Sequence, residues 1–562
     1  MSDQQKSLKQ IMDFRLEKLG QLINNGINPY PVKFNSTHLS NEIIENFSEY
    51  EGKIVVIAGR IMVIRKMGKA SFFQVMDSSG RIQIFIRRDD IGDANYSNFK
   101  LLDIGDFIGI EGQVFKTKTG EISIKTTVMT ILAKSIRPLP VVKEKDGQYF
   151  DSFTDKEQRY RNRHLDLILN PQVRETFHKR TKIIREIRNF LDKKGFLEVE
   201  TPILQPIYGG ANARPFTTHH NALNQKLFLR IADELYLKRL IIGGIDRVYE
   251  MAKDFRNEGM DRNHNPEFTI LELYVAYKDY FWMMELTESL IEKVCLEIYG
   301  KTKVEFDSKK IDFKAPYERI SITDAIIKFT GYDISGKNES ELRSKCRDLS
   351  IDIDDSMGEG KLIDAIFGNK CEKNFINPTF ITDYPKSMSP LTKEHRSNSN
   401  LTERFELIVN GMEIANAYSE LNDPIDQLKR FEDQLELSRK GDDEAMFIDM
   451  DFIKSLEFGM PPTSGIGIGI DRLVMLLTNK TSIQEVLFFP QMKPVKKEPD
   501  ISEDAKVIFN RLKNIEQILL TDFKSEFDLS NKKWDKILKE LRGNDLVDIF
   551  KSDDGNLFIK PI

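Results

Sequence analysis

A single arginine between two polar segments suggests nucleotide chemistry. Residues 255–258 read FRNE and, after a polar loop, residues 264–268 read HNPEF. When a carboxylate attacks the α-phosphate of ATP, charge develops on that phosphate and on the leaving pyrophosphate. A fixed guanidinium that grips phosphate and carboxylate oxygens together lowers this barrier by orientation and charge stabilisation. Arg256 is the candidate for that group, and the alternative is an ordinary charged hairpin.

A glycine-rich segment is the second candidate. Residues 465–472 read GIGIGIDR and precede the helical sequence LVMLLT. A Rossmann dinucleotide loop needs a different glycine spacing and a βαβ setting, so that interpretation fails. In a strand, the glycines leave one face bare for the close approach of backbone or a planar ring, while the isoleucines fill the core behind it.

Carboxylates gather at 404–423, a stretch that reads as a hairpin. Its Glu406 and Glu413 are the candidate metal ligands, because Mg²⁺ prefers oxygen ligands and usually bridges protein carboxylates to substrate phosphates. Unpaired carboxylates on a solvated strand are the alternative. The three cysteines are widely spaced and the seven histidines are scattered, so neither a disulfide framework nor a zinc site is indicated.

The elements upstream of these segments predict a small barrel. Short β-rich runs separated by glycine-containing turns lie at 54–64, 71–77, 81–88, 107–115 and 122–132. Strands this short and this numerous fit an OB-fold, whose exposed face commonly stacks unpaired bases on aromatic side chains. A purely structural β-domain is the alternative. The segment that follows, 136–150, reads as a linker.

Helical periodicity appears on both sides of the barrel. Apolar residues at helical spacing predict an N-terminal helix within 4–26, which either packs on the next domain or also touches RNA. A long amphipathic helix is predicted over 173–191, with Gly195 as its stop. From there to about residue 495, strands and helices alternate without regular crossovers. An antiparallel sheet with flanking helices, and an α+β fold, is therefore expected.

Length and composition bound the function. A chain of 562 residues should hold several domains, and 40% apolar with 30% charged residues is a globular composition. The sequence has no apolar run long enough to cross a bilayer and no signal-peptide core at its start, so the cytoplasm is the expected location. The formal charge of −5 gives no overall basic footprint, so any RNA contact must come from local clusters.

Three segments, in order, resemble the signature motifs of class II aminoacyl-tRNA synthetases, specifically subclass IIb and its lysyl-tRNA synthetases. They are 194–202, a helix-to-strand segment ending in Thr-Pro, then 255–268, then 465–472. The resemblance implies an N-terminal OB-fold, an antiparallel class II catalytic domain and a homodimer built on the first motif. The expected domains are a helical segment at 1–50, the OB-fold at 51–140, the catalytic domain at 151–495 and a small α/β extension at 497–562.

The resemblance also implies site residues for ATP. Arg256 and Arg472 would be the catalytic pair, with Glu258 on the adenine amino group, Phe268 stacked on the ring, and His264 and Asn265 on the phosphates. The full expected ATP-binding set is Arg256, Asn257, Glu258, His264, Asn265, Phe268, Glu406, Gly469, Asp471 and Arg472. Magnesium, bound by Glu406 and Glu413, is the expected cofactor.

The resemblance also implies an acidic pocket for the amino acid. Positions that match the lysine pocket are Gly210, Glu234, Arg256, Glu272, Tyr274, Asn416, Tyr418 and Glu420. Two carboxylates and a phenol can satisfy the three donors of an ammonium. Aspartyl and asparaginyl enzymes of the same architecture must instead present cationic or amide groups. Acidic charge alone does not exclude arginine as the substrate, although a guanidinium needs more room and a different arrangement of hydrogen-bond acceptors. The resemblance favours lysine.

The expected RNA partner is tRNA(Lys). In the barrel, Phe72 and Gln83 match positions that stack on and read the central anticodon base, a uracil for lysine. Arg65 is nearby and is expected to contact the anticodon too, although Ile64 stands where related enzymes tend to have a second basic residue. Because Phe72 and Phe73 lie on opposite faces of one strand, one of them must face outward, and we expect it to be Phe72. The implied reaction is a two-step ligation, in which lysine and ATP give lysyl-adenylate and the tRNA then takes the lysyl group.

Two further rivals stay open. One is a synthetase-derived RNA-binding or regulatory protein with an inactive site, which the joint presence of Arg256, Glu258, Glu406, Glu413 and Arg472 disfavours. The other is a ligase that lysylates protein, which the barrel at 54–132 disfavours. The extension at 497–562 reads as helices and a hairpin around Asp554 and Gly555, and it could be a winged-helix-like RNA module, a docking surface or a packing addition.

Overall fold

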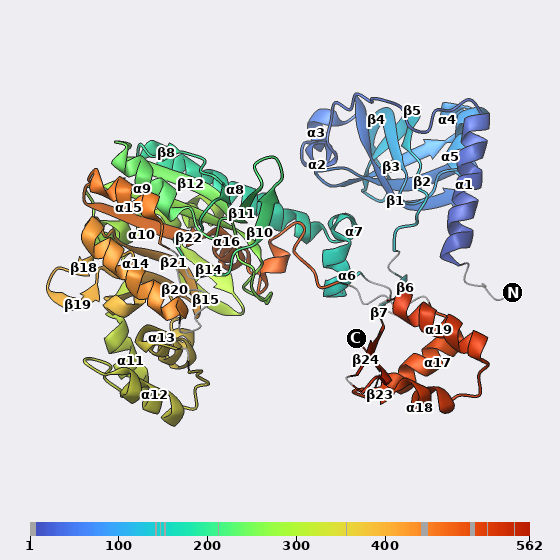
Figure 1. The fold of residues 1–562 in the computed structure, drawn as a ribbon. Helices are drawn as coiled ribbons and strands as arrows, with labels where there is room; N and C mark the ends of the chain where they lie inside the picture. The colour runs from blue at the N-terminus through green and yellow to red at the C-terminus, as the bar shows by residue number, and fades with distance from the viewer. Residues whose placement is uncertain are drawn as a thin grey trace. The chain divides into compact units, whose positions relative to one another are not determined.

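The fold is taken from a computed structural model that describes residues 7–140, 143–145, 148–150, 153–211, 213–355, 357–439, 448–494, 501–513, 515–544, 546–552 and 554–561. The chain forms two compact units, residues 1–490 and 491–562 (Figure 1). The predicted helix start at 4–6 and the predicted boundary at 495–497 lie outside the described residues.

The first part of the larger unit is a closed barrel with strand order β1-β2-β3-β5-β4. Alternating residues such as Ile57, Phe73 and Ile84 fill its core. The predicted OB-fold is confirmed. The elements are α1 (Leu8–Asn24), α2 (Ser40–Glu45), α3 (Phe47–Tyr50), β1 (Ile54–Met67), β2 (Ala70–Met76), β3 (Arg81–Arg87), α4 (Arg88–Ile91), α5 (Asp93–Lys100), β4 (Phe107–Lys116) and β5 (Ile122–Ala133).

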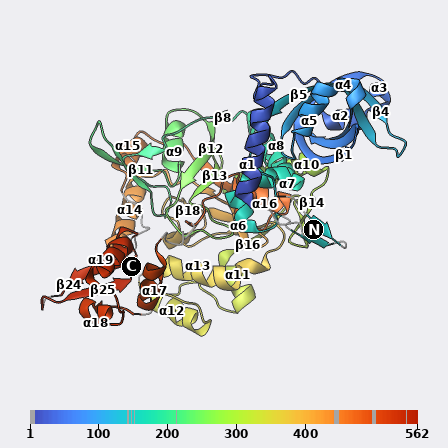
Figure 2. The same ribbon diagram turned by 90° about the vertical axis from the view of Figure 1, so that its right-hand side faces the viewer.

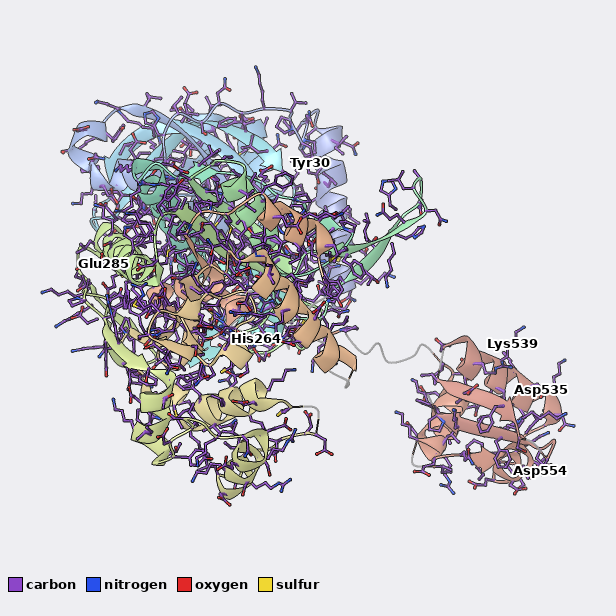
Figure 3. The ribbon with its side chains drawn as sticks, turned by 60° about the vertical axis from the view of Figure 1, so that its left-hand side comes forward. Tyr30, His264, Glu285, Asp535, Lys539 and Asp554 are labelled. Carbon is purple, nitrogen blue, oxygen red and sulfur yellow. The ribbon has the colours of Figure 1, made fainter. Side chains whose placement is uncertain are left out.

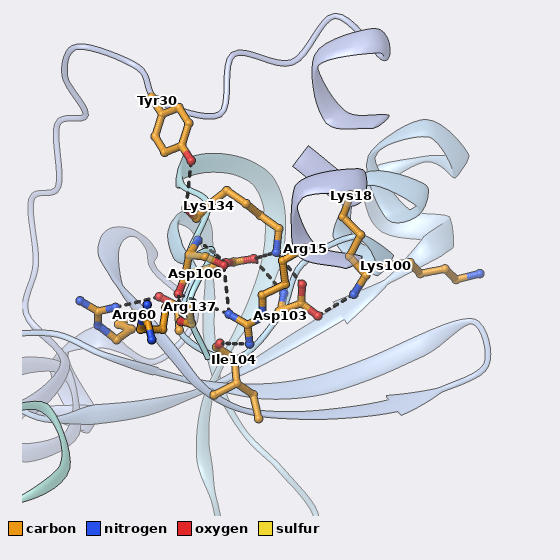
Figure 4. A network of polar contacts seen from close by, with 12 residues as sticks. Arg15, Lys18, Tyr30, Arg60, Lys100, Asp103, Ile104, Asp106, Lys134 and Arg137 are labelled. Atoms are coloured by element: carbon orange, nitrogen blue, oxygen red, sulfur yellow. Dashed lines mark hydrogen bonds and ion pairs between the residues drawn. The ribbon is translucent and has the colours of Figure 1, made fainter. Parts of the chain in front are cut away.

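Helix α1 is bound to the barrel by buried charges (Figure 4). Arg15 donates to the carbonyls of Ser135 and Ile104, each at 3.0 Å. Lys18 pairs with Asp103 at 2.5 Å, and the buried Lys134 pairs with both Asp103 and Asp106. The packing interpretation of this helix is therefore confirmed, while its contact with RNA stays a prediction.

The linker predicted at 136–150 is wrong in part, because it contains a short hairpin, β6 (Lys143–Lys145) and β7 (Gln148–Phe150). Residues 136–140 of the predicted linker form no helix or strand, and residues 141–142 and 146–147 lie outside the described residues.

An eight-stranded sheet of order β16-β17-β20-β21-β22-β13-β12-β8 forms the centre of the rest of this unit. Its strands are β8 (Leu197–Glu198), β12 (Arg247–Phe255), β13 (Glu267–Ala276), β16 (Glu318–Ser321), β17 (Thr379–Thr382), β20 (Arg404–Val409), β21 (Met412–Ser419) and β22 (Thr463–Gly469). Strands β17 to β12 pair antiparallel, as predicted, whereas the edge strands β16 and β8 pair in parallel. The α+β class is confirmed.

Helices cover both faces of this sheet (Figure 2). On one face α8 (Pro171–Lys193), α10 (Tyr280–Tyr299) and α16 (Ile470–Thr478) enclose the main core, which includes Ile187, Leu273, Leu290 and Ile466. On the other face α9 (Glu234–Ile242) and α15 (Met450–Glu457) pack through Leu237, Phe452 and neighbours. Gly195, at φ +79°, follows α8 as predicted and turns the chain into β8.

Smaller elements surround the sheet. They are α6 (Lys156–Arg161), α7 (Arg163–Leu169), β9 (Leu204–Gln205), β10 (Thr217–His220), β11 (Gln225–Leu229), β14 (Lys303–Phe306), β15 (Lys309–Asp312), α11 (Ile322–Thr330), α12 (Glu339–Asp348), α13 (Glu359–Lys370), η1 (Glu372–Asn374), η2 (Lys386–Met388), β18 (Glu394–His395), β19 (Asn398–Thr402), α14 (Pro424–Arg439) and η3 (Ile483–Glu485).

The smaller unit has a core of its own, which includes Ile508, Phe523, Trp534 and Ile559. Its elements are α17 (Glu503–Leu512), β23 (Ile518–Leu519), α18 (Leu520–Ser525), α19 (Asn531–Gly543), β24 (Val547–Lys551) and β25 (Leu557–Pro561). The predicted hairpin around Asp554 and Gly555 is confirmed, because β24 and β25 pair on either side of that turn. Over the described parts of both units, no helix is long and apolar enough to span a membrane.

Candidate functional site

A cavity of about 440 Å³ opens over strands β13, β21 and β22. It is lined by residues of the three candidate segments, which lie far apart in the sequence. Predicted residues on its wall are Gly210, Glu234, Arg256, Glu258, His264, Asn265, Phe268, Glu272, Tyr274, Glu413, Asn416, Tyr418, Gly469, Asp471 and Arg472. Asn257, Glu406 and Glu420 were predicted with them but are absent from the wall.

Arg256 leaves the end of β12 at the mouth of a strand-loop-strand motif. Phe255 pairs with Glu267 across the antiparallel β12–β13 ladder, and the Arg256 amide donates to the Pro266 carbonyl at 2.8 Å. The guanidinium carbon lies 5.1 Å from the ring centroid of Phe268. Its Nε is buried and has no hydrogen-bond partner among the described residues. A buried donor without a partner is costly, so this guanidinium is poised for an anionic ligand.

His264, which is labelled in Figure 3, joins the segment 255–268 to the segment 465–472. Its Nδ1 lies 2.8 Å from a carboxylate oxygen of Asp261, and its Nε2 lies 2.9 Å from Nη2 of Arg472. Nη1 of Arg472 donates to the Glu413 carbonyl at 2.7 Å. Together with Arg256, these side chains give the cavity a cationic rim, which suits the phosphates of a nucleotide.

Asp471 supports this cationic rim through contacts with strand β13 and helix α8. Its Oδ2 accepts from the Thr269 amide at 2.8 Å, and its Oδ1 pairs with Arg180 of α8 at 2.6 Å. The side chain is almost fully buried. Asp471 was predicted to bind ATP, yet its carboxylate is already engaged, so in this arrangement it fixes the start of α16 and thereby Arg472.

The opposite end of the cavity is acidic. Glu272 is buried and accepts from the Tyr274 hydroxyl at 3.1 Å, while Glu234 accepts from the Tyr418 hydroxyl at 2.6 Å. Burial, together with Glu234 and Asp254, raises the pKa of Glu272 well above its usual value. Buried carboxyl groups this close together favour the binding of a cationic ligand, because a nearby positive charge stabilises their ionised form.

Lys238 is the site residue that sequence reasoning missed. Its side chain is fully buried, and its ammonium contacts Glu234 at 2.5 Å and also Glu420. One cation therefore serves two carboxylates. Burial and the neighbouring Glu234 raise the pKa of Glu420 to about 8. The four-residue spacing of Glu234 and Lys238 on α9 was the available signal, but only the fold brings Glu420 to them.

Glycines in β22 make room for this acidic end. A Cβ on Gly465 would lie 2.2 Å from Tyr274 Cε1 and 2.4 Å from Glu420 Oε1. A Cβ on Gly467 would lie 2.5 Å from Glu272 Oε1. The bare strand face was expected to admit backbone or a planar ring. At Gly465 the planar ring of Tyr274 approaches it, as expected, together with Glu420, and at Gly467 the carboxyl group of Glu272 does so. A Cβ on Gly469 would meet only ordinary contacts.

Glu406 and Glu413 lie on the paired strands β20 and β21, which form the predicted hairpin. Arg404 donates to Glu406 at 2.6 Å, and Arg472 lies 3.6 Å from Glu413. Burial, with Glu413 and Asp364 nearby, raises the pKa of Glu406 to about 8. A buried carboxyl with this excess of negative neighbours fits a divalent cation shared with substrate phosphates. In the described residues no larger cluster of His, Cys, Asp or Glu forms a complete metal cage.

The barrel carries its three predicted residues on one face. Phe73 is buried in the core and Phe72 is only half-buried, so the expectation that Phe72 faces outward is confirmed. Arg65 pairs with Phe72 and Gln83 pairs with Gln74 in the strand ladders, which places all three predicted side chains on the outer surface. The Phe72 ring lies 4.9 Å from that of Phe85. A half-buried aromatic pair on the outer face of the barrel, beside an arginine, suits a stacked base.

Comparison with known proteins adds family information. The pattern of class II tRNA synthetases (D, K and N) matches residues 155–493, and that of an OB-fold nucleic acid binding domain matches residues 55–132. A lysine–tRNA ligase of Christiangramia forsetii is 59% identical over 557 residues, covering 98% of each chain. Lysine–tRNA ligases from two strains of Porphyromonas gingivalis are 61% identical over 495 residues, covering 86% of each chain.

Proposed function

The chain belongs to the class II tRNA synthetases of the D, K and N group, and we propose that it activates L-lysine with ATP and transfers the lysyl group to the 3′ end of tRNA(Lys). The observation that carries the choice of lysine is the acidic end of the cavity, where the buried carboxyl groups of Glu234 and Glu420 share one buried cation and that of Glu272 has none.

The amino acid follows from charge. Aspartate would place another carboxylate beside carboxyl groups whose ionised form is already destabilised by burial. Asparagine would bring no positive charge to these groups. Lysine brings an ammonium with three donors. Glu420 Oε1 lies beside Gly465, makes no hydrogen bond to a described residue, and is the acceptor proposed for it with Glu272. Glu234 and Gly210 are proposed to hold the α-amino group.

Adenylation follows from the cationic rim. Arg256 binds the lysine carboxylate and the α-phosphate together, so that the carboxylate oxygen forms a bond to phosphorus as the bond to pyrophosphate breaks. Arg472, His264 and Asn265 bind the phosphates, and Phe268 and Glu258 hold adenine; Asn257 and Gly469 shape the same site.

In the second step, a hydroxyl of the terminal ribose of the tRNA attacks the acyl carbon of the adenylate, and AMP leaves. No protein nucleophile is required.

Magnesium is the proposed cofactor. Glu406 and Glu413 would hold it, and when bound it supplies charge neutralisation at the ATP phosphates. The raised pKa of Glu406 supports this assignment, because a divalent cation would favour its ionised form. Arg404 orders both Glu406 and Asn416, to which it donates at 3.1 Å, and so links the metal end of the cavity to the lysine end.

The division of labour along the chain is also proposed. Residues 51–140 bind the anticodon through Phe72, Gln83 and Arg65, residues 151–495 catalyse both steps, and residues 1–50 brace the barrel. A homodimer built on the segment 194–202 and a cytoplasmic location accord with the family.

Charging of RNA tests the proposal. The purified chain is incubated with ATP, Mg²⁺, total tRNA and one radiolabelled amino acid at a time, and acid-precipitable label is counted. Label from lysine alone is expected, with transcribed tRNA(Lys) as sufficient acceptor. Charging with aspartate or asparagine would identify a different member of the family, and failure to charge any RNA would support an inactive RNA-binding relative.

A further inference from the structure

The smaller unit has the connectivity of a winged helix. Its elements follow the order α17, β23, α18, α19, β24, β25, and its antiparallel sheet has the order β23-β25-β24. Helices α18 and α19 form a helix-turn-helix, closed by the stacking of Phe527 on Trp534 at 6.0 Å. The β24–β25 hairpin supplies the wing. In helix-turn-helix units the second helix is the one that meets a nucleic acid.

Helix α19 has two opposite faces. Its apolar face is buried in the core of the unit and consists of Trp534, Ile537, Leu538 and Leu541. At a helical repeat of 3.6 residues, the side opposite this face carries Lys532, Lys536 and Lys539, and all three are exposed. Figure 3 shows Lys539 and Asp535 on α19, and Asp554 at the turn of the wing.

These three lysines make no ion pair with any residue in the described part of the chain, although other cations of the unit do. Lys533, at the margin of the face, pairs with Asp504 at 2.7 Å, and Arg511 pairs with Glu526 at 2.9 Å. The acidic Glu540 on the same helix is turned toward α17, where it accepts from Ser502 at 2.6 Å. The centre of the exposed face is therefore cationic in a chain whose formal charge is −5.

We propose that this lysine face of α19 binds the phosphate backbone of the tRNA that the enzyme charges; that the nucleic acid is this tRNA rests on the proposed function. Lysines are flexible point charges suited to phosphates, whereas base reading is usually the work of Arg, Asn and Gln. Side chains cannot read the deep, narrow major groove of A-form RNA, so backbone contact is the mode this face can make. The extension thus adds sequence-independent affinity to the contacts of the barrel.

The test is a charge-removal experiment on the full chain. In the triple variant K532A/K536A/K539A, tRNA(Lys) binding is measured between 50 and 200 mM salt. Each phosphate contact contributes about 0.7–0.9 to the slope of log K against log salt, so the loss of three contacts should reduce the slope by roughly 2–3. The dissociation constant near 0.1 M salt should rise at least about tenfold.

A matched control distinguishes the loss of the proposed binding site from a general change in net charge. The variant K506A/R511A/K513A removes the same charge from α17 and its end, and it should leave the slope within about one of the original chain. Equal losses in both variants, or no loss in the first, would overturn the proposal. The proposal would also be overturned if the α19 variant bound tRNA(Lys) normally and had instead lost affinity for a DNA duplex or for a protein partner. Thermal unfolding checks that both variants are folded.

The proposed function is tested separately on the same unmodified protein. Lysine-dependent exchange of pyrophosphate into ATP needs no RNA. Its absence would contradict lysine activation while leaving the salt dependence of RNA binding to decide the role of α19.

Discussion

At the scale of the residue, the cavity contains more carboxyl groups than its own cations can neutralise. Glu234 and Glu420 share the ammonium of Lys238, and the carboxyl of Glu272 has the hydroxyl of Tyr274. Both Glu272 and Glu420 have raised pKa values because they are buried beside other carboxyls. Three carboxyl groups with one cation leave a deficit of two positive charges, and the side-chain ammonium of lysine would supply one of them.

Lysine binding should therefore release protons. Burial and Glu234 raise the pKa of the Glu420 carboxyl to about 8, so a fraction of it is protonated at pH 7 in the free enzyme, and the substrate ammonium favours its ionised form. Affinity for lysine should rise with pH, by up to about tenfold per unit, and level off above about pH 8. Calorimetry at pH 7 in buffers of different ionisation enthalpy measures the release. Glu420→Gln should reduce the release, and proton uptake on binding would contradict this account.

Lys238→Met should destabilise the enzyme. The substitution leaves Glu234 and Glu420 buried without their cation, and losing one partner of a buried pair typically costs about 3–5 kcal/mol. Urea unfolding should show a lower midpoint. The double variant Lys238→Met with Glu420→Gln should recover part of the loss, because it removes both partners of that pair.

The exposed pair Lys454–Asp451, at 3.6 Å, provides the comparison. Lys454→Met should cost less than about 1 kcal/mol. If Lys238→Met were as mild as this control, the buried ammonium would not be holding the carboxylates.

At the scale of the element, β22 matters because its glycines leave space for side chains of β13 and for Glu420. Gly467→Ala places a methyl group 2.5 Å from Glu272 Oε1, and Glu272 must move to accommodate it. We expect the KM for lysine in pyrophosphate exchange to rise at least about tenfold, since a displacement near 1 Å can cost two orders of magnitude.

Gly368 in α13 is the matched control. A Cβ there would meet nothing within 4 Å, so Gly368→Ala should leave exchange intact and stabilise the helix by roughly 0.5–1 kcal/mol. Equal KM values for the two variants would show that the bare face of β22 is not needed for lysine.

Much of the fold could be predicted at this scale. Short β-rich runs between glycine-containing turns placed the barrel strands within a few residues of their observed ends, and the period of 3.6 placed α8. Helices α4 and α5 escaped because residues 88–100 are short, polar and without a clear period. The parallel edge strands β8 and β16 are too short for a pattern to reveal their direction.

The site was predicted where a motif is contiguous and missed where the fold assembles it. Arg256 with Phe268, and Gly465 with Gly467, lie in short recognisable segments, and the structure brings them to one cavity. Lys238 looks in the sequence like any basic residue on an amphipathic helix. The role of Lys238 depends on its burial beside Glu420, which cannot be predicted from the local sequence pattern. The engagement of Asp471 by Arg180 is hidden for the same reason.

At the scale of the whole molecule, the account requires an RNA surface besides the catalytic cavity. Phe72→Ala should weaken tRNA(Lys) binding by about 1–3 kcal/mol, or roughly fivefold to 150-fold in Kd, because one stacking surface is lost. Phe72→Trp should retain most of the affinity. Filter binding measures both.

Val128 on β5 serves as the control on the barrel, because its side chain is 50% exposed and apolar. Val128→Ala should change the Kd for tRNA less than twofold, as expected for a surface apolar residue without a stacking role. A loss at Val128 that matched the loss at Phe72 would show that the effect arises from the barrel as a whole.

The most direct test of the central claim is pyrophosphate exchange into ATP with each amino acid supplied alone. An acidic pocket beside a phosphate-binding arginine predicts exchange with lysine, little with arginine, whose guanidinium needs a different fork, and none with aspartate or asparagine. Exchange that depends on aspartate or asparagine and ignores lysine would contradict the account.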